Sequence, residues 1–179
     1  MAYSHVIRGR AWVITAPDGG LFANIDTDMI FHNSYLAITD INEMGQYIFD
    51  NLEGWENFAE KAQPGDIVIA GPNFGCGSSR QQAVDGFRAL GIQAIVADSF
   101  GAIYFRNAVN IGFPLVRCQG KLKVDSVKNM SEIEINFESG NITDPADGTT
   151  LVEALPMSPV QKSIMEAGSL YAYGRTALG

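Results

Sequence analysis

A glycine-rich bend places two hydroxyl groups and a guanidinium within a few residues of each other. Its sequence is Asn73-Phe74-Gly75-Cys76-Gly77-Ser78-Ser79-Arg80. The bend follows the apolar, β-branched segment 67–70, which is typical of a buried strand in a parallel sheet. We expect a helix over 79–90 to follow, capped by Ser78 or Ser79. Backbone N–H groups, the helix dipole and the side chain of Arg80 would then converge on an anion such as a carboxylate.

Other uses of this bend are consistent with the same residues. The glycines can simply permit the turn while Ser78 caps the helix, and Cys76 can be either a small packing residue or a nucleophile. No lysine follows the glycines, and their spacing is not that of a dinucleotide fingerprint, so a nucleotide site is disfavoured. The chain's two histidines, His5 and His32, fall in predicted strand and loop positions that give Cys76 no obvious base.

Composition indicates a folded globular protein. The chain has 179 residues, of which 46% are hydrophobic and 18% charged, and we predict a single domain spanning residues 1–179. A net charge of −8 disfavours nucleic acid and anionic membrane as partners, since both would repel the chain. The sequence starts without a signal-peptide pattern and contains no apolar run long enough for a membrane span, so we expect a cytoplasmic protein.

The chain offers few metal ligands. Its two cysteines, Cys76 and Cys118, are not in a CxxC arrangement, and there are only two histidines. We therefore predict no zinc or iron–sulfur ligand set within this chain. Any metal must come from another protein.

The elements that position the bend alternate between strand and helix. Strands are predicted at 67–70, 93–97 and 113–116, with helices over 79–90 and 100–110 between them. Asp98 and Ser99 are placed to cap the second helix. This alternation predicts an α/β fold with parallel strands and right-handed crossovers.

The regions before and after this alternating segment have different residue patterns. On the amino-terminal side we predict a strand over 6–15, a loop with no clear period over 24–39, and helices over 41–52 and 55–61. After Cys118 we predict short strands at 133–137 and 150–155 and a last helix over 160–167 that ends at Gly168.

Several further motifs accompany the bend in a fixed order. They are Asn24-Ile25-Asp26-Thr27-Asp28, Tyr35-Leu36, Ala97-Asp98-Ser99-Phe100, Phe105-Arg106-Asn107-Ala108, Ile111-Gly112-Phe113-Pro114 and Ile164-Met165-Glu166-Ala167-Gly168. Together with the bend they resemble the small subunits of the isopropylmalate isomerase (3-isopropylmalate dehydratase) and homoaconitase group, within the aconitase superfamily. The resemblance covers nearly the whole chain.

This resemblance implies a fold and a partner. The fold would be that of the aconitase swivelling domain, a three-layer β/β/α arrangement with a mostly parallel sheet flanked by helices and a second β layer. The partner would be a large subunit that carries a [4Fe–4S] cluster, in a heterodimer or heterotetramer active as a hydro-lyase on a small di-acid. Apart from the resemblance, exposed strands of the β-rich C-terminal part would allow the chain to self-associate.

The resemblance also implies roles for residues of the bend. Ser78 would be the base that removes a proton α to a carboxylate, and Ser79 and Arg80 would bind the substrate carboxylate. A serine hydroxyl is a very weak acid, so its alkoxide would need the helix dipole, N–H donors and a neighbouring arginine. The chain departs from the family at Gln81-Gln82, where Glu-His is common; glutamine keeps the size and hydrogen bonding of these side chains but loses a charge and a titratable group.

In this group, substrate specificity is attributed to the loop after Tyr-Leu, which here reads Tyr35-Leu36-Ala37-Ile38-Thr39. Homoaconitase-like members carry an arginine where this chain has Ala37, which cannot pair with an additional carboxylate. A buried, unpaired carboxylate would cost several kcal/mol, so the loop favours a substrate with an alkyl arm. The resemblance therefore implies conversion of 2-isopropylmalate to 3-isopropylmalate through isopropylmaleate, a step of leucine biosynthesis.

Alternatives remain at this stage. A 2,3-dimethylmalate, citramalate-type or homoaconitate dehydratase would use comparable chemistry. The loop at 35–39 could be a packed lid without substrate contact. From a different class, the chain could be a non-catalytic module that binds a small anion, or a thiol enzyme that uses Cys76.

Overall fold

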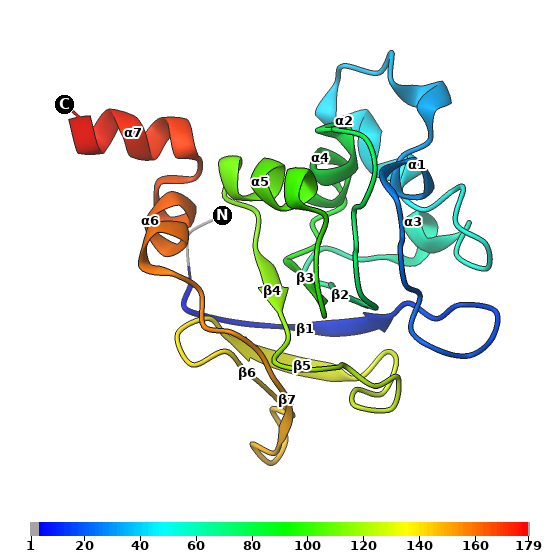
Figure 1. Cartoon of the computed structure of the whole chain (residues 1–179), viewed down its shortest axis with the longest axis vertical. Coiled ribbons are helices and arrows are strands. Elements are labelled where there is room, and N and C mark those ends of the chain that lie inside the picture. Colours follow the sequence, from blue (N-terminus) through cyan, green and yellow to red (C-terminus); the bar gives the residue numbers. More distant parts are fainter. Residues whose placement is uncertain (1–3, 179) are drawn as a thin grey trace.

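The computed structural model of the chain describes residues 4–178, which form one seven-stranded sheet with helices on one side of its parallel half (Figure 1). The strand order is β4-β3-β2-β1-β5-β6-β7. The strands are β1 (Val6–Val13), β2 (Ile67–Ala70), β3 (Ala94–Ala97), β4 (Leu115–Arg117), β5 (Glu132–Asn136), β6 (Asn141–Thr143) and β7 (Thr150–Glu153).

The helices are mostly short. The α-helices are α1 (Thr27–Ile30), α2 (Ile41–Met44), α3 (Phe58–Lys61), α4 (Gln82–Ala89), α5 (Ala102–Asn110), α6 (Pro159–Ala167) and α7 (Leu170–Leu178). Two 3₁₀ turns, η1 (Asn33–Tyr35) and η2 (Gly45–Tyr47), lie in the segment between α1 and α3. None of the helices within 4–178 is long and apolar enough to cross a bilayer.

Strand β1 belongs to both halves of the sheet. Its end, residues 11–13, pairs in parallel with residues 67–69 of β2, and its beginning, residues 6–10, pairs antiparallel with β5. Strands β1 to β4 are therefore parallel, whereas β5, β6 and β7 are antiparallel. Helices α4 and α5 form the connections from β2 to β3 and from β3 to β4, as the alternating pattern predicts.

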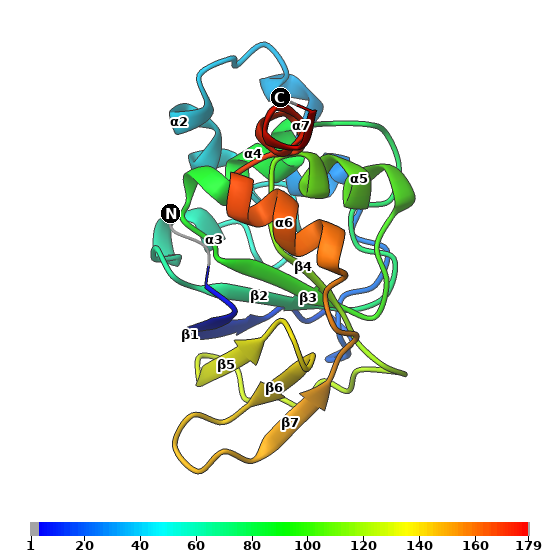
Figure 2. The same cartoon turned by 90° about the vertical axis from the view of Figure 1, so that its left-hand side faces the viewer.

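Two apolar cores separate three layers. Val68 and Ala70 of β2 face the helices, where aromatic side chains such as Phe87 fill the core. Ile67 and Ile69 face the opposite way and pack in the same core as residues of β5, β6 and β7. The antiparallel strands thus form a second β layer beneath the parallel strands (Figures 1 and 2). The predicted three-layer β/β/α fold is confirmed.

Several predicted elements differ in the structure. The helices expected over 41–52 and 55–61 are reduced to α2, η2 and α3. The chain leaves the helical path at Phe49, which has a φ of +65° and donates its N–H to the carbonyl of Ile30 at 3.0 Å. Burial of Ile48, Phe49 and Leu52 in one core requires this irregular backbone. Strand β6 and helix α7 have no counterpart in the sequence prediction, whereas α6 and its end at Gly168 are confirmed.

Candidate active site

The bend at 73–80 lies at the carboxyl edge of the parallel strands, between two other loops. On one side, the N–H of Gly75 donates to the carbonyl of Ile25 at 2.7 Å, and the N–H of Thr27 donates to the carbonyl of Cys76 at 2.9 Å. On the other side, Phe74 exchanges backbone hydrogen bonds with Ser99 and Gly101 at 3.0 and 2.8 Å. The path of the bend is therefore fixed from both sides before any side chain is considered.

Gly75 is required where it stands. Its φ is +73°, and a Cβ atom would lie 2.2 Å from the ring of Tyr104. Tyr104 is fully buried on α5 and donates its hydroxyl to the carbonyl of Ala83 at 3.2 Å. Since this ring connects α5 to α4 directly beneath the bend, any larger residue at 75 would push the bend away from the helices.

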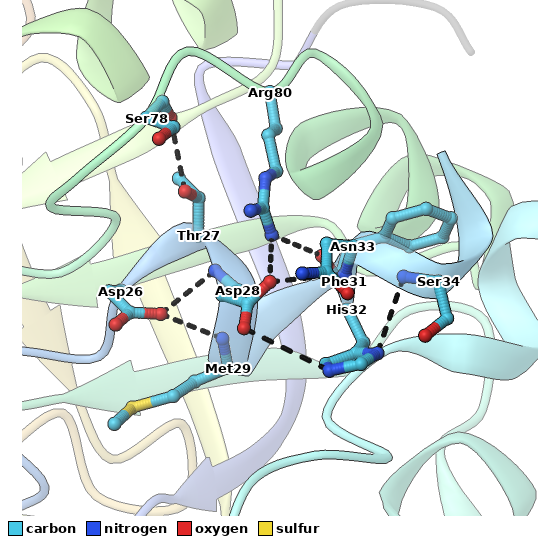
Figure 3. Close-up of polar contacts among 10 residues, drawn as sticks. All are labelled: Asp26, Thr27, Asp28, Met29, Phe31, His32, Asn33, Ser34, Ser78 and Arg80. Atoms are coloured by element: carbon cyan, nitrogen blue, oxygen red, sulfur yellow. Dashed lines mark hydrogen bonds and ion pairs between the residues drawn. The ribbon is translucent and has the colours of Figure 1, made fainter. Parts of the chain in front are cut away.

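Ser78 and Ser79 are exposed at the tip of the bend. The backbone carbonyl of Ser78 accepts a hydrogen bond from the Thr27 hydroxyl at 3.0 Å (Figure 3). Ser79 accepts a long hydrogen bond, 3.5 Å, from the side chain of Asn107 on α5. Among the residues that the structure describes, the Ser78 hydroxyl has no hydrogen-bond partner, so its backbone is held while its oxygen remains available.

The serines do not cap α4, and this prediction was wrong. The helix begins at Gln82, after Gln81, which makes no side-chain cap. The segment from Ser78 to Arg80 is instead held by α1, through Thr27 at one end and through the side chain of Arg80 at the other. The dipole of a helix acts mainly within its first turn, so it contributes little at Ser78.

The predicted cap of the next helix was also wrong, for a similar reason. Helix α5 follows Gly101, and neither Asp98 nor Ser99 caps it. Ser99 uses its hydroxyl to accept the N–H of Asn73 at 2.8 Å, and Asp98 accepts the N–H of Leu122 at 2.6 Å. Both side chains connect loops at the carboxyl edge rather than starting a helix.

Arg80 reaches from the bend to α1 (Figure 3). Its Nη1 donates to Oδ1 of Asp28 at 2.5 Å and to the carbonyl of Phe31 at 3.0 Å. The hydrogen bond from Arg80 is the main reason why the pKa of Asp28 is lowered, so the carboxylate stays ionised. The Nε and Nη2 atoms make no hydrogen bond to the rest of residues 4–178. Arg80 is therefore aimed by Asp28 and keeps donors for a further carboxylate.

Asp28 is a site residue to which the sequence prediction gave no role. Its position follows from Asp26, whose carboxyl oxygen accepts the N–H groups of Asp28 and Met29, both at 2.8 Å, and so starts α1. The capping pattern of an aspartate followed by a second acidic residue in the first turn was visible in the sequence. Its pairing with Arg80, 52 positions later in the chain, was not.

The predicted specificity loop is anchored at two points. The ring of Tyr35 stacks on that of Tyr47 with centroids 4.1 Å apart, and Ile38 packs against the apolar core between the parallel strands and the helices. Leu36, Ala37 and Thr39 are exposed between and beyond these anchors. The loop is linked to the bend only indirectly: Asp28, which holds Arg80, also accepts the N–H of Asn33 at 3.0 Å, just before Tyr35.

Cys76 does not have the environment of a reactive thiol. Burial, followed by the nearby charge of Asp26, raises its pKa, and its Sγ lies 3.6 Å from the carbonyl of Asn24 as a donor. A thiol with a raised pKa is mostly protonated near neutral pH and is a poor nucleophile. The thiol-enzyme hypothesis therefore has no support in this geometry.

The residues from 4 to 178 do not group into a metal site: no three His, Cys, Asp or Glu side chains gather closely enough to hold an ion. The two cysteines are unpaired, and burial raises the pKa of Cys118 to about 12. An iron–sulfur cluster, which needs several thiolates, does not fit this chain.

Comparison with known proteins agrees with this arrangement. The Aconitase C-terminal domain family matches residues 20–119. The 3-isopropylmalate dehydratase small subunit 1 of Methanopyrus kandleri is 39% identical, over 92% of this chain and 90% of its own. The isopropylmalate/citramalate isomerase small subunit of Methanocaldococcus jannaschii is 36% identical, over 94% and 93%.

A solved structure shows the same fold. The crystal structure of a 3-isopropylmalate dehydratase from Methanocaldococcus jannaschii superposes with a TM-score of 0.82 at 32% identity, over 97% of this chain and 95% of that one. The chain therefore belongs to the aconitase C-terminal domain family and, within it, to the small subunits of the isopropylmalate dehydratase group.

Proposed function

We propose that this chain is the small subunit of a cytoplasmic hydro-lyase that interconverts 2-isopropylmalate and 3-isopropylmalate through isopropylmaleate. The observation that carries the proposal is that one bend at the carboxyl edge presents two uncommitted groups: the Ser78 hydroxyl, and the Nε and Nη2 donors of Arg80, whose Nη1 is held by Asp28 and the Phe31 carbonyl. The names of the relatives support the same reaction. The two unpaired cysteines suit a reducing compartment.

The chain contributes proton transfer and carboxylate binding. Arg80 holds a substrate carboxylate through Nε and Nη2, and Ser79 adds a hydroxyl donor beside it. The Ser78 alkoxide takes the proton α to that carboxylate and becomes a neutral hydroxyl, and the electron pair of the broken C–H bond forms the C=C bond of isopropylmaleate as hydroxide leaves. For isomerisation, Ser78 returns the proton to the alkene carbon that had carried the hydroxyl, and hydroxide adds to the other alkene carbon.

Ser78 needs help to act as a base. Because α4 starts at Gln82, the helix dipole does not supply it, and Arg80 is the cation that this part of the chain offers. Exclusion of water by a partner that covers the exposed serines would strengthen the electrostatic attraction between a Ser78 alkoxide and the Arg80 guanidinium.

Departure of hydroxide requires a Lewis acid, which a [4Fe–4S] cluster on a large subunit would provide when present. The relatives are named small subunits, which supports the proposal that this chain acts in a heteromer with such a partner.

The substrate has an alkyl arm rather than a third carboxylate. The exposed part of the loop, Leu36-Ala37 with Thr39, contains no cation. A distal carboxylate held there would be buried without a partner when the heteromer closes. Citramalate is the second candidate substrate, because one relative carries both acids in its name.

Reconstitution tests the proposal. The purified chain is titrated into a purified large subunit under anaerobic conditions, and the ultraviolet absorbance of the conjugated double bond is followed with 2-isopropylmalate, citramalate and homocitrate. We expect turnover only in the mixture, fastest with 2-isopropylmalate. Carboxylate binding by the isolated chain, with no turnover in any mixture, would favour the anion-binding module instead.

A further inference from the structure

Helix α5 carries a hollow on the same edge of the molecule as the serines. It has a volume of about 480 Å³, and we call it the α5 groove. Its apolar side is formed by Phe100, Ala102, Phe105 and Val109, and two arginines, Arg106 and Arg117, stand beside them. Figure 2 shows α5 in the helix layer above the parallel strands.

The two arginines of the groove have no acidic partner. Neither makes a hydrogen bond or ion pair through its side chain within the described residues, and both are exposed. The side chains of both arginines are therefore free to meet a carboxylate of a ligand or partner, although the chain itself carries 20 acidic residues. Two unpaired guanidinium groups above an apolar surface complement a ligand that is both apolar and acidic.

The groove is continuous with the candidate active site. Ser99, which also lines it, accepts the N–H of Asn73 at the start of the bend. Asn107, next to Arg106 on α5, donates to Ser79. A macromolecule that covers the serines must therefore lie over or beside the groove, and aromatic residues and arginines are the residue types that such interfaces favour.

We propose that the α5 groove is a docking site for the large subunit, and that it receives a segment that presents an apolar side chain flanked by at least one carboxylate. The inference rests on the proposed function, since it requires that partner. The apolar surface includes Ile103 on the outer side of α5, which is 44% exposed and extends the contact beyond the hollow. The arginines orient the approaching subunit, and the apolar side chains hold it.

The test compares charge reversals in the full-length chain. Arg106→Glu and Arg117→Glu are made singly and together, and Lys128→Glu, an exposed lysine that does not line the groove, serves as the charge-matched control. Dissociation constants with the large subunit are measured by isothermal titration calorimetry, and turnover is measured at saturating small subunit.

We expect each arginine reversal to weaken assembly about tenfold, and more in the double variant, with kcat at saturation unchanged. Added salt should weaken the wild-type complex more than that of the double variant. The control should assemble like the wild type.

Two results would overturn the docking site and leave the proposed function intact: unchanged assembly in the double variant, or 2-isopropylmalate binding to the isolated chain that shifts NMR signals of α5 and is lost in that variant. The second would assign the groove to a small acid. If the wild-type chain neither binds the large subunit nor supports turnover, the proposed function itself fails.

Discussion

The polar groups at the two edges of the parallel sheet differ in how completely they are hydrogen-bonded. At the amino edge, Asp66 precedes β2 and is only 3% exposed. Its carboxylate accepts hydrogen bonds from Arg10 at 3.1 and 2.7 Å, from the indole of Trp12 at 2.6 Å and from the N–H of Gln63 at 2.8 Å. At the carboxyl edge, the Ser78 hydroxyl and two nitrogens of Arg80 are left without partners among the described residues.

This difference indicates that the amino edge contributes mainly to the stability of the fold and the carboxyl edge mainly to the reaction. A buried charge stabilises only if its hydrogen bonds are complete, and Asp66 meets that condition. A reacting group must instead keep its bonding capacity for the substrate, and the backbone around Ser78 is fixed while its side chain is not. We therefore expect changes at the carboxyl edge to alter turnover and changes at the amino edge to alter folding.

Apart from removal of the Ser78 hydroxyl itself, the largest effect is expected for Arg80→Lys. Lysine keeps the charge but cannot hold Asp28, the Phe31 carbonyl and a substrate carboxylate together. We expect kcat/KM of the assembled enzyme to fall by roughly a hundredfold to a thousandfold, with the urea midpoint nearly unchanged. Arg88→Lys, on an exposed position of α4, is the control and should have normal kinetics. Equal loss in both variants would contradict a specific role for Arg80.

At the other edge, Asp66→Asn should destabilise the fold and spare the chemistry. The substitution leaves the Arg10 and Trp12 donors facing an amide, and we expect the free energy of unfolding to fall by about 3 kcal/mol. Urea denaturation measures this loss. The activity per folded, assembled molecule should equal that of the wild type. Lower kcat at full assembly would show that the two edges are not independent.

The same residue predicts a dependence on pH. Burial alone raises the pKa of Asp66, but the hydrogen bonds from Arg10, Trp12 and the Gln63 N–H outweigh it and lower the pKa in the folded state. The unfolded chain therefore binds a proton first as the pH falls below about 4. The stabilisation is complete above that pH and is lost as the pH drops through the lowered folded pKa. Between pH 5 and 2, the free energy of unfolding from urea denaturation should change less with pH for Asp66→Asn than for the wild type.

A smaller effect is expected for Asp28→Asn, since Asp28 positions Arg80, the residue that we propose binds the substrate carboxylate. We expect KM to rise about tenfold while kcat falls less, because carboxylate binding loses its aimed guanidinium. Asp40→Asn, at the exposed N-cap of α2, is the matched control. If Asp28→Asn lowered only thermal stability, its role would be structural.

The smallest effect is expected at Ala37, which is exposed and accepts a longer side chain without disturbing the core. Ala37→Arg should weaken turnover of 2-isopropylmalate several-fold and improve that of a substrate with an additional carboxylate. Ala37→Gln has similar length and no charge, and it should not gain the second activity. Unchanged selectivity in the arginine variant would remove this loop from substrate recognition.

Local sequence patterns predicted the parallel half of the fold well. Short β-branched runs and the glycines after them identify β2, β3 and the bend, because buried strands and left-handed turns have strict residue requirements. The family motifs placed Ser78, Ser79 and Arg80 at this edge.

The two helix starts were predicted incorrectly for different reasons. Helix α4 begins only at Gln82, after the backbone carbonyl of Ser78 and the side chain of Arg80 have been fixed by contacts with Thr27 and Asp28. Before α5, the side chains of Asp98 and Ser99 accept hydrogen bonds from loop backbone instead of from the helix end.

What the sequence could not provide depends on distant contacts. The sharing of β1 between two halves of the sheet is a matter of register with β2 and β5, which no local pattern encodes. The pairing of Asp28 with Arg80 connects segments that only the folded chain brings together. The irregular segment around Phe49 is likewise set by burial, which overrides helix propensity.

Replacement of the Ser78 hydroxyl tests the central claim most directly. Ser78→Ala, with Ser79→Ala beside it for comparison, is assembled with the large subunit, and the complex is verified by sedimentation before turnover is measured. We predict normal assembly and a loss of kcat of at least about 10³-fold for Ser78→Ala, with a smaller loss for Ser79→Ala. Near-wild-type turnover by the assembled Ser78→Ala enzyme would contradict the assignment of this oxygen as the base.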